Sequence, residues 1–317
     1  MSESIQYELH ELDMLKVDVA DELLAGLQQT QKSIAPKYFY DERGSELFTE
    51  ITGTQEYYVT RTEIALLKQY GAEMAACIGP DSLLIEYGSG SSEKIRILLD
   101  QVKPKIYAPL DISRDYLDSA AVGVATEYPW LEVKAACLDY TQPFSLPFAL
   151  LDNCAGFFPG SSIGNFTPDS AIEFLSRVRN QLQDKGGLLL GVDLKKDDVV
   201  LNAAYNDTAG ITAAFNLNVL SHINNLIGSN FDTSQFVHFA QYNDKLGCIQ
   251  MFLESLSNQR VEVLGKTIEF SKGEMIHTED SFKYSVSEVE LMARSAGFNE
   301  IKSWTDEKGW FGIFYLF

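Results

Sequence analysis

The chain has 317 residues, of which 45% are hydrophobic and 22% charged, so it is long enough to bury a core without disulfide or metal staples. Its formal net charge of −20 would repel a phosphate backbone, which excludes nucleic acid from the partners we expect. No stretch approaches the 18 apolar residues of a membrane span, and the acidic start MSESIQYELHELDM is not expected to act as a secretory signal.

Short apolar strands alternate with helical patterns through the central part of the chain. The run Thr60-Arg-Thr-Glu63 predicts a capping box that opens a helix to about Cys77. The predicted strands are Leu83–Tyr87, Ile106–Leu110, Glu132–Cys137, Ala155–Pro159 and Gly187–Leu194. Helices are predicted over about 92–101 and 114–127, and a third begins at Thr167-Pro168. This alternation is typical of a parallel α/β sheet.

The alternation stops after the fifth strand and resumes near the C-terminus. A helical pattern over Val199–Leu226 is followed by β-like runs at Phe236–Tyr242, Ile249–Leu256 and Arg260–Phe270, which predicts an insertion. The core pattern returns with a helix over Ser287–Ala296 and strands at Ile301–Trp304 and Trp310–Leu316. Two strands joined by a short turn predict an antiparallel hairpin at a sheet edge. We therefore predict a core domain at 61–197 plus 281–317 and a second domain at 1–60 plus 198–280.

Small residues follow the first strand of this core, at Gly88-Ser-Gly90. Glycines at such a turn let the backbone approach a ligand closely, although a lone G-x-G also occurs in turns that bind nothing. Three residues later stands Glu93, where a dinucleotide fingerprint requires glycine or alanine. An acid at that position would face a pyrophosphate, so nicotinamide and flavin dinucleotides are disfavoured.

Acidic residues also follow the next two strands. Asp111 ends the second strand, 21 residues after Gly90, where a carboxylate can accept both hydroxyls of an adenosine ribose. Asp139 follows the third strand and is placed to take the adenine amino group, with Tyr140 as a ring neighbour. Either acid alone could simply cap a loop, but these residues at adjacent strand ends form a more specific pattern. We predict a phosphate-free adenosine ligand, S-adenosylmethionine, with Lys94 pairing either with its carboxylate or with a neighbouring acid.

Three segments with many aromatic and amide residues, together with the glycine turn, occur in a fixed order along the chain. They are Lys37–Phe48 with Glu56–Arg61, Glu86–Lys94, Gly160–Pro168 and Tyr205–Asn216. From about Lys37 to the C-terminus the chain resembles the histidine Nα-methyltransferase family of ergothioneine biosynthesis. The resemblance implies a class I methyltransferase, with a Rossmann-like seven-stranded sheet and a second, substrate-binding domain formed by the N-terminus and the insertion. It implies trimethylation of free L-histidine to hercynine, whereas relatives methylate other amino acids such as prenylated tryptophan.

The same resemblance implies roles for individual residues. Tyr40, Tyr57 and Asn165 are the expected catalytic residues, which would hold the amino and carboxylate groups of the substrate. The residues implied for substrate binding are Tyr40, Tyr57, Gly160, Asn165, Tyr205, Met251, Glu279 and Ser281. Those implied for the cofactor are Gly88, Lys94, Asp111, Asp139 and Tyr140.

The chemistry of these residue types agrees with the implied roles. A buried amide at Asn165 would offer two donors and an acceptor, which suits a carboxylate, and Glu279 can accept from an imidazole N–H. The alternatives without a binding role are a solvated acid at Glu279 and core packing at Met251. This chain has Val59 where the family has proline, and one extra residue, His277, before Thr278-Glu279. The extra residue predicts a local shift of Glu279.

Several alternatives stay open on these observations. A methyltransferase for another amino acid or amine is the nearest, followed by a nicotinamide oxidoreductase and a non-catalytic adenosyl-binding protein. The four cysteines lie far apart and are expected to be free thiols in a reducing compartment, which predicts a cytoplasmic enzyme. A monomer is a separate expectation that does not rest on the cysteines. No metal-ligand cluster is evident in the sequence, and His10, His222 and His238 are expected to have structural or surface roles.

Overall fold

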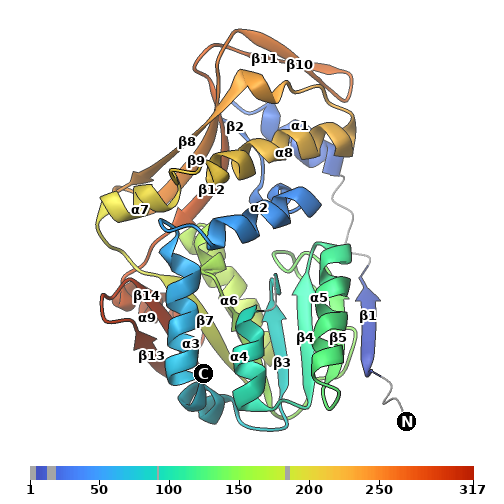
Figure 1. The fold of residues 1–317 in the computed structure, drawn as a ribbon, viewed down its shortest axis with the longest axis vertical. Coiled ribbons are helices and arrows are strands. Elements are labelled where there is room, and N and C mark those ends of the chain that lie inside the picture. The colour runs from blue at the N-terminus through green and yellow to red at the C-terminus, as the bar shows by residue number, and fades with distance from the viewer. Residues whose placement is uncertain (1–4, 13–18, 91–92, 183–185) are drawn as a thin grey trace. The chain divides into compact units, whose positions relative to one another are not determined.

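The computed structural model of the chain describes residues 5–12, 19–90, 93–182 and 186–317, and it divides into two units. Unit 1 lies within residues 1–14, 59–195 and 283–317, and unit 2 within 15–58 and 196–282. Figure 1 shows their elements. No helix in the described ranges is long and apolar enough to cross a membrane.

An eight-stranded sheet forms the centre of unit 1, with the order β1-β5-β4-β3-β6-β7-β14-β13. The strands are β1 (Tyr7–Glu11), β3 (Leu83–Tyr87), β4 (Ile106–Asp111), β5 (Glu132–Cys137), β6 (Cys154–Phe158), β7 (Gly187–Asp193), β13 (Ile301–Thr305) and β14 (Phe311–Leu316). All neighbouring pairs are parallel except those that β14 forms with β7 and β13. The seven predicted strands and the closing antiparallel hairpin are thereby confirmed, and the topology is that of a class I methyltransferase.

Helices cover both faces of this sheet, which explains why strands β3, β6, β7 and β14 are buried along their whole length. In Figure 1, α4 and α5 lie in front of the sheet and α6 lies behind it. The helices of unit 1 are α3 (Tyr58–Ile78), α4 (Glu93–Val102), α5 (Arg114–Glu127), α6 (Pro168–Leu182) and α9 (Val286–Ser295). The predicted start of α4 at Ser92 lies outside the described residues. Ser285 and Glu288 form a capping box at α9.

Two predictions about the N-terminal part of the chain are wrong. Residues 7–11 do not join the insertion, because β1 pairs in parallel with β5, whose outer edge would otherwise expose unpaired N–H and C=O groups. The capping box predicted at Thr60–Glu63 is also absent, because α3 already begins at Tyr58 and Glu63 is fully buried.

Unit 2 contains a four-stranded sheet in the order β2-β12-β9-β8 and a separate hairpin of β10 and β11. Its strands are β2 (Lys32–Ser33), β8 (Phe236–Asn243), β9 (Cys248–Ser255), β10 (Gln259–Val263), β11 (Lys266–Phe270) and β12 (Met275–Phe282). Its α-helices are α1 (Val19–Leu27), α2 (Glu42–Thr52), α7 (Asp198–Ala204) and α8 (Ile211–Ile227), with short 3₁₀ turns η1 (Pro36–Phe39) and η4 (Thr233–Gln235). Helix α8 packs on β8, β9 and α2.

The single helical stretch predicted over Val199–Leu226 is divided into α7 and α8. The break lies at residues 205–210, where the Asp207 carboxylate accepts the Ile211 and Thr212 N–H groups at 2.9 and 2.7 Å. These bonds cap α8 and favour a new helix over continuation of the first. The turn brings Tyr205 to the end of α7.

Candidate active site

The glycine turn after β3 lies against the ends of two other strands of unit 1. Gly88 has φ of +74°, and a Cβ there would lie 3.1 Å from the Tyr140 hydroxyl oxygen. The Gly88 N–H donates to the Leu110 carbonyl at 2.8 Å, and the Gly90 N–H lies 3.4 Å from Asp111 Oδ2. These residues therefore lie together at the carboxyl-terminal ends of β3, β4 and β5, as expected for a parallel sheet.

Asp111 is an almost buried acid surrounded by backbone donors. Burial raises the pKa of its carboxyl group, while the N–H groups of Ser113, at 3.0 Å, and Gly90 act in the opposite direction. Its oxygens are held in place by these bonds at the end of β4. The two carboxylate oxygens can accept further hydrogen bonds, and a ligand with two adjacent hydroxyls could donate them.

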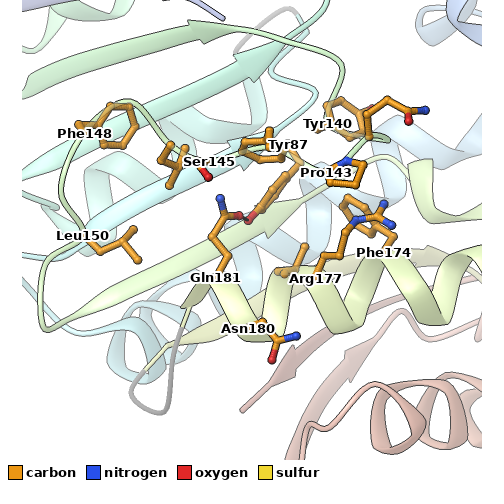
Figure 2. Close-up of a pocket in the computed structure, with 14 residues that line it drawn as sticks. Tyr87, Tyr140, Pro143, Ser145, Phe148, Leu150, Phe174, Arg177, Asn180 and Gln181 are labelled. Carbon is orange, nitrogen blue, oxygen red and sulfur yellow. Dashed lines mark hydrogen bonds between the residues drawn. The ribbon is translucent and has the colours of Figure 1, made fainter. Parts of the chain in front are cut away.

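Asp139 and Tyr140 follow β5 in a loop that is tied to α6. The Thr141 N–H donates to Asp139 Oδ1 at 3.0 Å, and Arg177 Nη2 donates to the Thr141 carbonyl at 2.8 Å. The Tyr140 ring packs against Phe158, with centroids 5.8 Å apart. It also lines a cavity of about 490 Å³, and Figure 2 shows Tyr140 at the opposite end of this cavity from Phe148 and Leu150.

Sequence reasoning missed a buried acid that faces the predicted cofactor lysine. Glu63 on α3 has no exposed surface, and its Oε2 lies 2.6 Å from Lys94 Nζ. The Gly160 N–H donates to the same carboxylate, at 3.0 and 2.9 Å from its two oxygens. Lys94 thus pairs with Glu63 on α3 rather than with its neighbour Glu93. The Gly160 N–H already has Glu63 as its acceptor, so it is not available to a substrate.

The surroundings of Glu63 explain how a charged residue fits into the core. A Cβ on Gly191 would lie 2.2 Å from Glu63 Oε1, so β7 leaves room for the carboxylate only because this residue is glycine. A buried acid with a cationic partner and a backbone donor is satisfied where an isolated one would not be. The helical period indicates its burial, because Glu63 follows Val59 by four residues and precedes Leu66 and Leu67 on one face.

The amide predicted to be buried after β6 is exposed. Asn165 ends the 3₁₀ turn η2 (Ser162–Asn165), whose inward-facing residue is Ile163. The loop before this turn has two successive residues in the left-handed region, Gly160 with φ of +75° and Ser161 with φ of +59°. The Ser161 hydroxyl accepts the Asp193 N–H at 2.9 Å and fixes this strained loop to β7.

In unit 2, three of the predicted substrate residues lie next to one another. The Tyr205 hydroxyl donates to Ser281 Oγ at 2.8 Å, and the rings of Tyr57 and Tyr205 have centroids 6.3 Å apart. Glu56 joins the same two segments, because its carboxylate accepts from the Thr208 N–H and hydroxyl at 3.1 and 2.8 Å. These hydrogen bonds lower the pKa of Glu56, and they fix the Tyr57 segment to the turn between α7 and α8.

Glu279 lies opposite Met251 in the pairing of β12 with β9, and the two side chains are only 7% and 2% exposed. The register shifts between His277 and Glu279, which indicates a β-bulge at Thr278, where the sequence predicts a local shift of Glu279. Glu279 and Ser281 are both buried, so the bulge leaves them on the same, inward face of the sheet. A solvated surface acid at Glu279 is thereby excluded.

Tyr40 belongs to an aromatic cluster that also contains Tyr57. Its ring lies 5.9 Å from that of Phe48 and 5.9 Å from that of Phe215, and Phe48 in turn lies 6.3 Å from Tyr57. The cluster therefore links Tyr40 to Tyr57 through edge contacts between rings.

Comparison with known proteins gives this arrangement a family. Residues 19–317 match the model of a family described as histidine-specific methyltransferases that depend on S-adenosylmethionine (SAM). The chain belongs to this family. It is 40% identical to a histidine N-alpha-methyltransferase of Mycolicibacterium smegmatis over 91% of both chains. It is 32% identical to ergothioneine biosynthesis protein 1 of Neurospora crassa, over 84% of this chain and 31% of that protein.

Members of this family use SAM as cofactor, and the residues of unit 1 fit it. The Ser89 hydroxyl in the glycine turn is buried and has no hydrogen-bond partner among the described residues, so a ligand there would satisfy it. Any side chain at Gly88 would enter the space beside Tyr140. Asp111 and Asp139, the acids at the ends of β4 and β5, would repel a phosphate group. They therefore suit SAM, which carries none.

Proposed function

We propose that this chain transfers three methyl groups from SAM to the α-amino nitrogen of free L-histidine, which gives hercynine in the first step of ergothioneine biosynthesis. The identity of 40% with a histidine N-alpha-methyltransferase, over nine-tenths of both chains, supports the proposal. The roles of the individual residues are part of the same proposal.

The observation in the structure that carries the choice of substrate is the placement of Glu279. This buried residue of β12 lies opposite the apolar Met251 of β9 and two residues before the buried Ser281. An imidazole ring can donate an N–H to such an acid while its carbon edge packs on a thioether. A phenyl ring offers no donor and would leave the acid desolvated, so the arrangement favours histidine over apolar amino acids.

Tyr57, Tyr205 and Tyr40 are proposed to hold the amino and carboxylate end of the substrate, together with Gly160 and Asn165. Because the Gly160 N–H is bonded to Glu63, we propose that Gly160 contributes its carbonyl oxygen or its lack of a side chain. Gly88, Lys94, Asp111, Asp139 and Tyr140 are proposed to hold SAM, with Asp111 on the ribose hydroxyls and Asp139 and Tyr140 at the adenine. We further propose that unit 1 is the cofactor domain and unit 2 carries the substrate side-chain pocket.

When bound, SAM would supply an electrophilic methyl group, whose C–S bond breaks as the amine nitrogen bonds to its carbon, so that S-adenosylhomocysteine leaves with the electron pair. The chain's own task is to present a neutral amine in line with that methyl group. Holding two reactants in such a geometry supplies up to roughly 7–11 kcal/mol of the barrier. The α-ammonium must lose a proton before each transfer, and we propose that the tyrosine hydroxyls and water carry it away.

The experiment that tests the proposal compares L-histidine with histamine, which keeps the imidazole and amine but lacks the carboxylate. We expect methylation of histidine and very little of histamine, measured as S-adenosylhomocysteine released. Imidazole itself serves as the control for ring methylation. Comparable turnover of histamine would contradict the assignment of an α-amino-acid substrate.

A second candidate substrate is tryptophan or one of its derivatives. The chain is 27% identical to a 4-dimethylallyltryptophan N-methyltransferase of Aspergillus fumigatus, over 92% of this chain and 91% of that one. Because an indole N–H could also donate to Glu279, the choice of histidine over tryptophan rests on the higher identity to the histidine enzyme. A cytoplasmic enzyme remains our proposal, supported by the four free cysteines. We also propose a monomer.

A further inference from the structure

A chain of part-buried hydrogen bonds in unit 2 ends on the backbone of Tyr205. His238 on β8 lies with its Nε2 at 2.9 Å from the Tyr205 carbonyl oxygen. Its other ring nitrogen, Nδ1, lies 2.8 Å from the side-chain nitrogen of Asn216 on α8. That Asn216 nitrogen also donates to the Phe252 carbonyl of β9, at 2.9 Å.

The chemistry of the end groups determines where each hydrogen lies. A backbone carbonyl only accepts, so His238 Nε2 must carry the hydrogen toward Tyr205, and Asn216 Nδ2 must carry the hydrogen toward Phe252. The second Asn216 hydrogen then points at Nδ1, which accepts it only if the imidazole is neutral. The relay works in one direction, from Asn216 through His238 to the backbone of Tyr205.

Asn216 is retained in the interior at an energetic disadvantage. It is fully buried, and its Oδ1 has no hydrogen-bond partner among the described residues. A buried amide with one unsatisfied oxygen is unfavourable for stability alone, where an apolar residue would pack without loss. The two donors of the amide are nevertheless both used, and one of them fixes His238.

We infer that Asn216 and His238 are positioning residues, whose relay holds the Tyr205 backbone so that its hydroxyl meets Ser281 in the substrate pocket. This inference rests on the proposed role of Tyr205 in holding the amino and carboxylate end of the substrate. The Tyr205 side chain is bonded at 2.8 Å to Ser281 and its carbonyl at 2.9 Å to His238, so both ends of the residue are fixed. Because that end is common to all amino acids, the inference applies to whichever one the enzyme uses.

Protonation of His238 would interrupt the relay, because Nδ1–H would then face the donating amide of Asn216. Turning the amide around would restore that contact but would break the bond to Phe252. Burial lowers the pKa of His238, whereas the Tyr205 carbonyl and the nearby charge of Asp207 act in the opposite direction. The neutral, bonded form therefore prevails near neutrality, and substrate binding should weaken on the acid side.

The test is steady-state kinetics with L-histidine at saturating SAM, together with SAM affinity by calorimetry. His238→Ala should raise the KM for histidine by about tenfold or more while SAM affinity stays at the parent value. His238→Gln keeps an N–H donor but cannot take a proton, so it should recover part of this loss. It should also make the acid limb of the kcat/KM profile less steep, leaving only the part that comes from protonation of the substrate's own amine. Asn216→Leu should raise KM in the same direction as His238→Ala.

Asn224→Ala is the matched control, because Asn224 lies on the same helix and also donates to a backbone carbonyl, that of Phe231 at 2.8 Å. It should lower the melting temperature without changing KM. The inference is overturned if the His238 and Asn216 variants lose stability as Asn224→Ala does while KM and the acid limb stay unchanged. Equal losses of SAM and histidine affinity would also overturn it. If the parent instead prefers another amino acid, the proposed function fails and the same comparison is made on that substrate.

Discussion

Removing the Glu279 carboxylate should change which amino acid the enzyme prefers. Glu279 is 7% exposed and faces Met251 across the strand pair, so a bound imidazole would give it a charge-assisted hydrogen bond in a site with little water. Such a bond contributes about 1.5–3 kcal/mol, which corresponds to about a ten- to 150-fold loss of kcat/KM for histidine in Glu279→Ala. For phenylalanine the same change removes an acid that the ring would otherwise desolvate, at a cost of about 1–3 kcal/mol.

The two effects act in opposite directions on the two substrates, so the preference for histidine over phenylalanine should shrink roughly 10²- to 10⁴-fold. The assay is steady-state kinetics of the parent and Glu279→Ala on both amino acids. Asp280→Ala is the matched control, since Asp280 is the next acid on β12 but pairs with His277 at 2.9 Å, and it should leave the preference unchanged. A Glu279→Ala enzyme with the parent's ratio would show that this acid does not contact the ring.

Three further variants test the groups of unit 1. Asp111→Ala should weaken SAM binding by about ten- to 150-fold in calorimetry, because it loses charge-assisted bonds to the ribose, and unchanged affinity in a folded variant would remove Asp111 from the cofactor site. Glu86 is buried beside the Tyr107 hydroxyl, and burial raises its pKa to about 8 from the usual 4.5, so the folded protein keeps a proton that the unfolded chain releases. Glu86 should therefore lower the free energy of unfolding increasingly as the pH rises from about 4.5 to 8. Glu86→Gln should be more stable than the parent at pH 8 but hardly so at pH 5. An equal gain in unfolding free energy at both pH values would refute this pH dependence. Glu63→Gln should lower the unfolding free energy by about 3–5 kcal/mol by leaving Lys94 without its partner, and the double variant with Lys94→Met should recover part of that loss in urea unfolding. A single variant as stable as the parent would show that the pair contributes nothing.

The sheet of unit 1 could be predicted because its strands are short apolar runs bounded by turns, and such runs fit a sheet covered on both faces. The Tyr7–Glu11 strand could not, because its five residues become a strand only by covering the edge of β5. The division of one helical stretch into α7 and α8 depends on Asp207 as a cap, which the apolar periodicity does not reveal.

The candidate site shows the same limit. Glu63 looked like a capping residue by local pattern, whereas the helical period placed it on the buried face, and its partner Lys94 is 31 residues away. Asn165 was expected to be buried because of its chemistry, but the turn that ends there directs Ile163 inward instead. The effect on Glu279 of the extra residue predicted at His277 could not be foreseen from sequence, because a β-bulge can add one residue to a strand without turning Glu279 outward.

The most direct measurement of the central claim is incubation of the purified chain with SAM and all twenty amino acids, followed by mass spectrometry of the products. We expect that histidine alone is consumed at an appreciable rate and that mono-, di- and trimethylated histidine appear in succession, with all methyl groups on the α-nitrogen. Methylation on the imidazole ring, or preferential consumption of tryptophan or another amino acid, would contradict it.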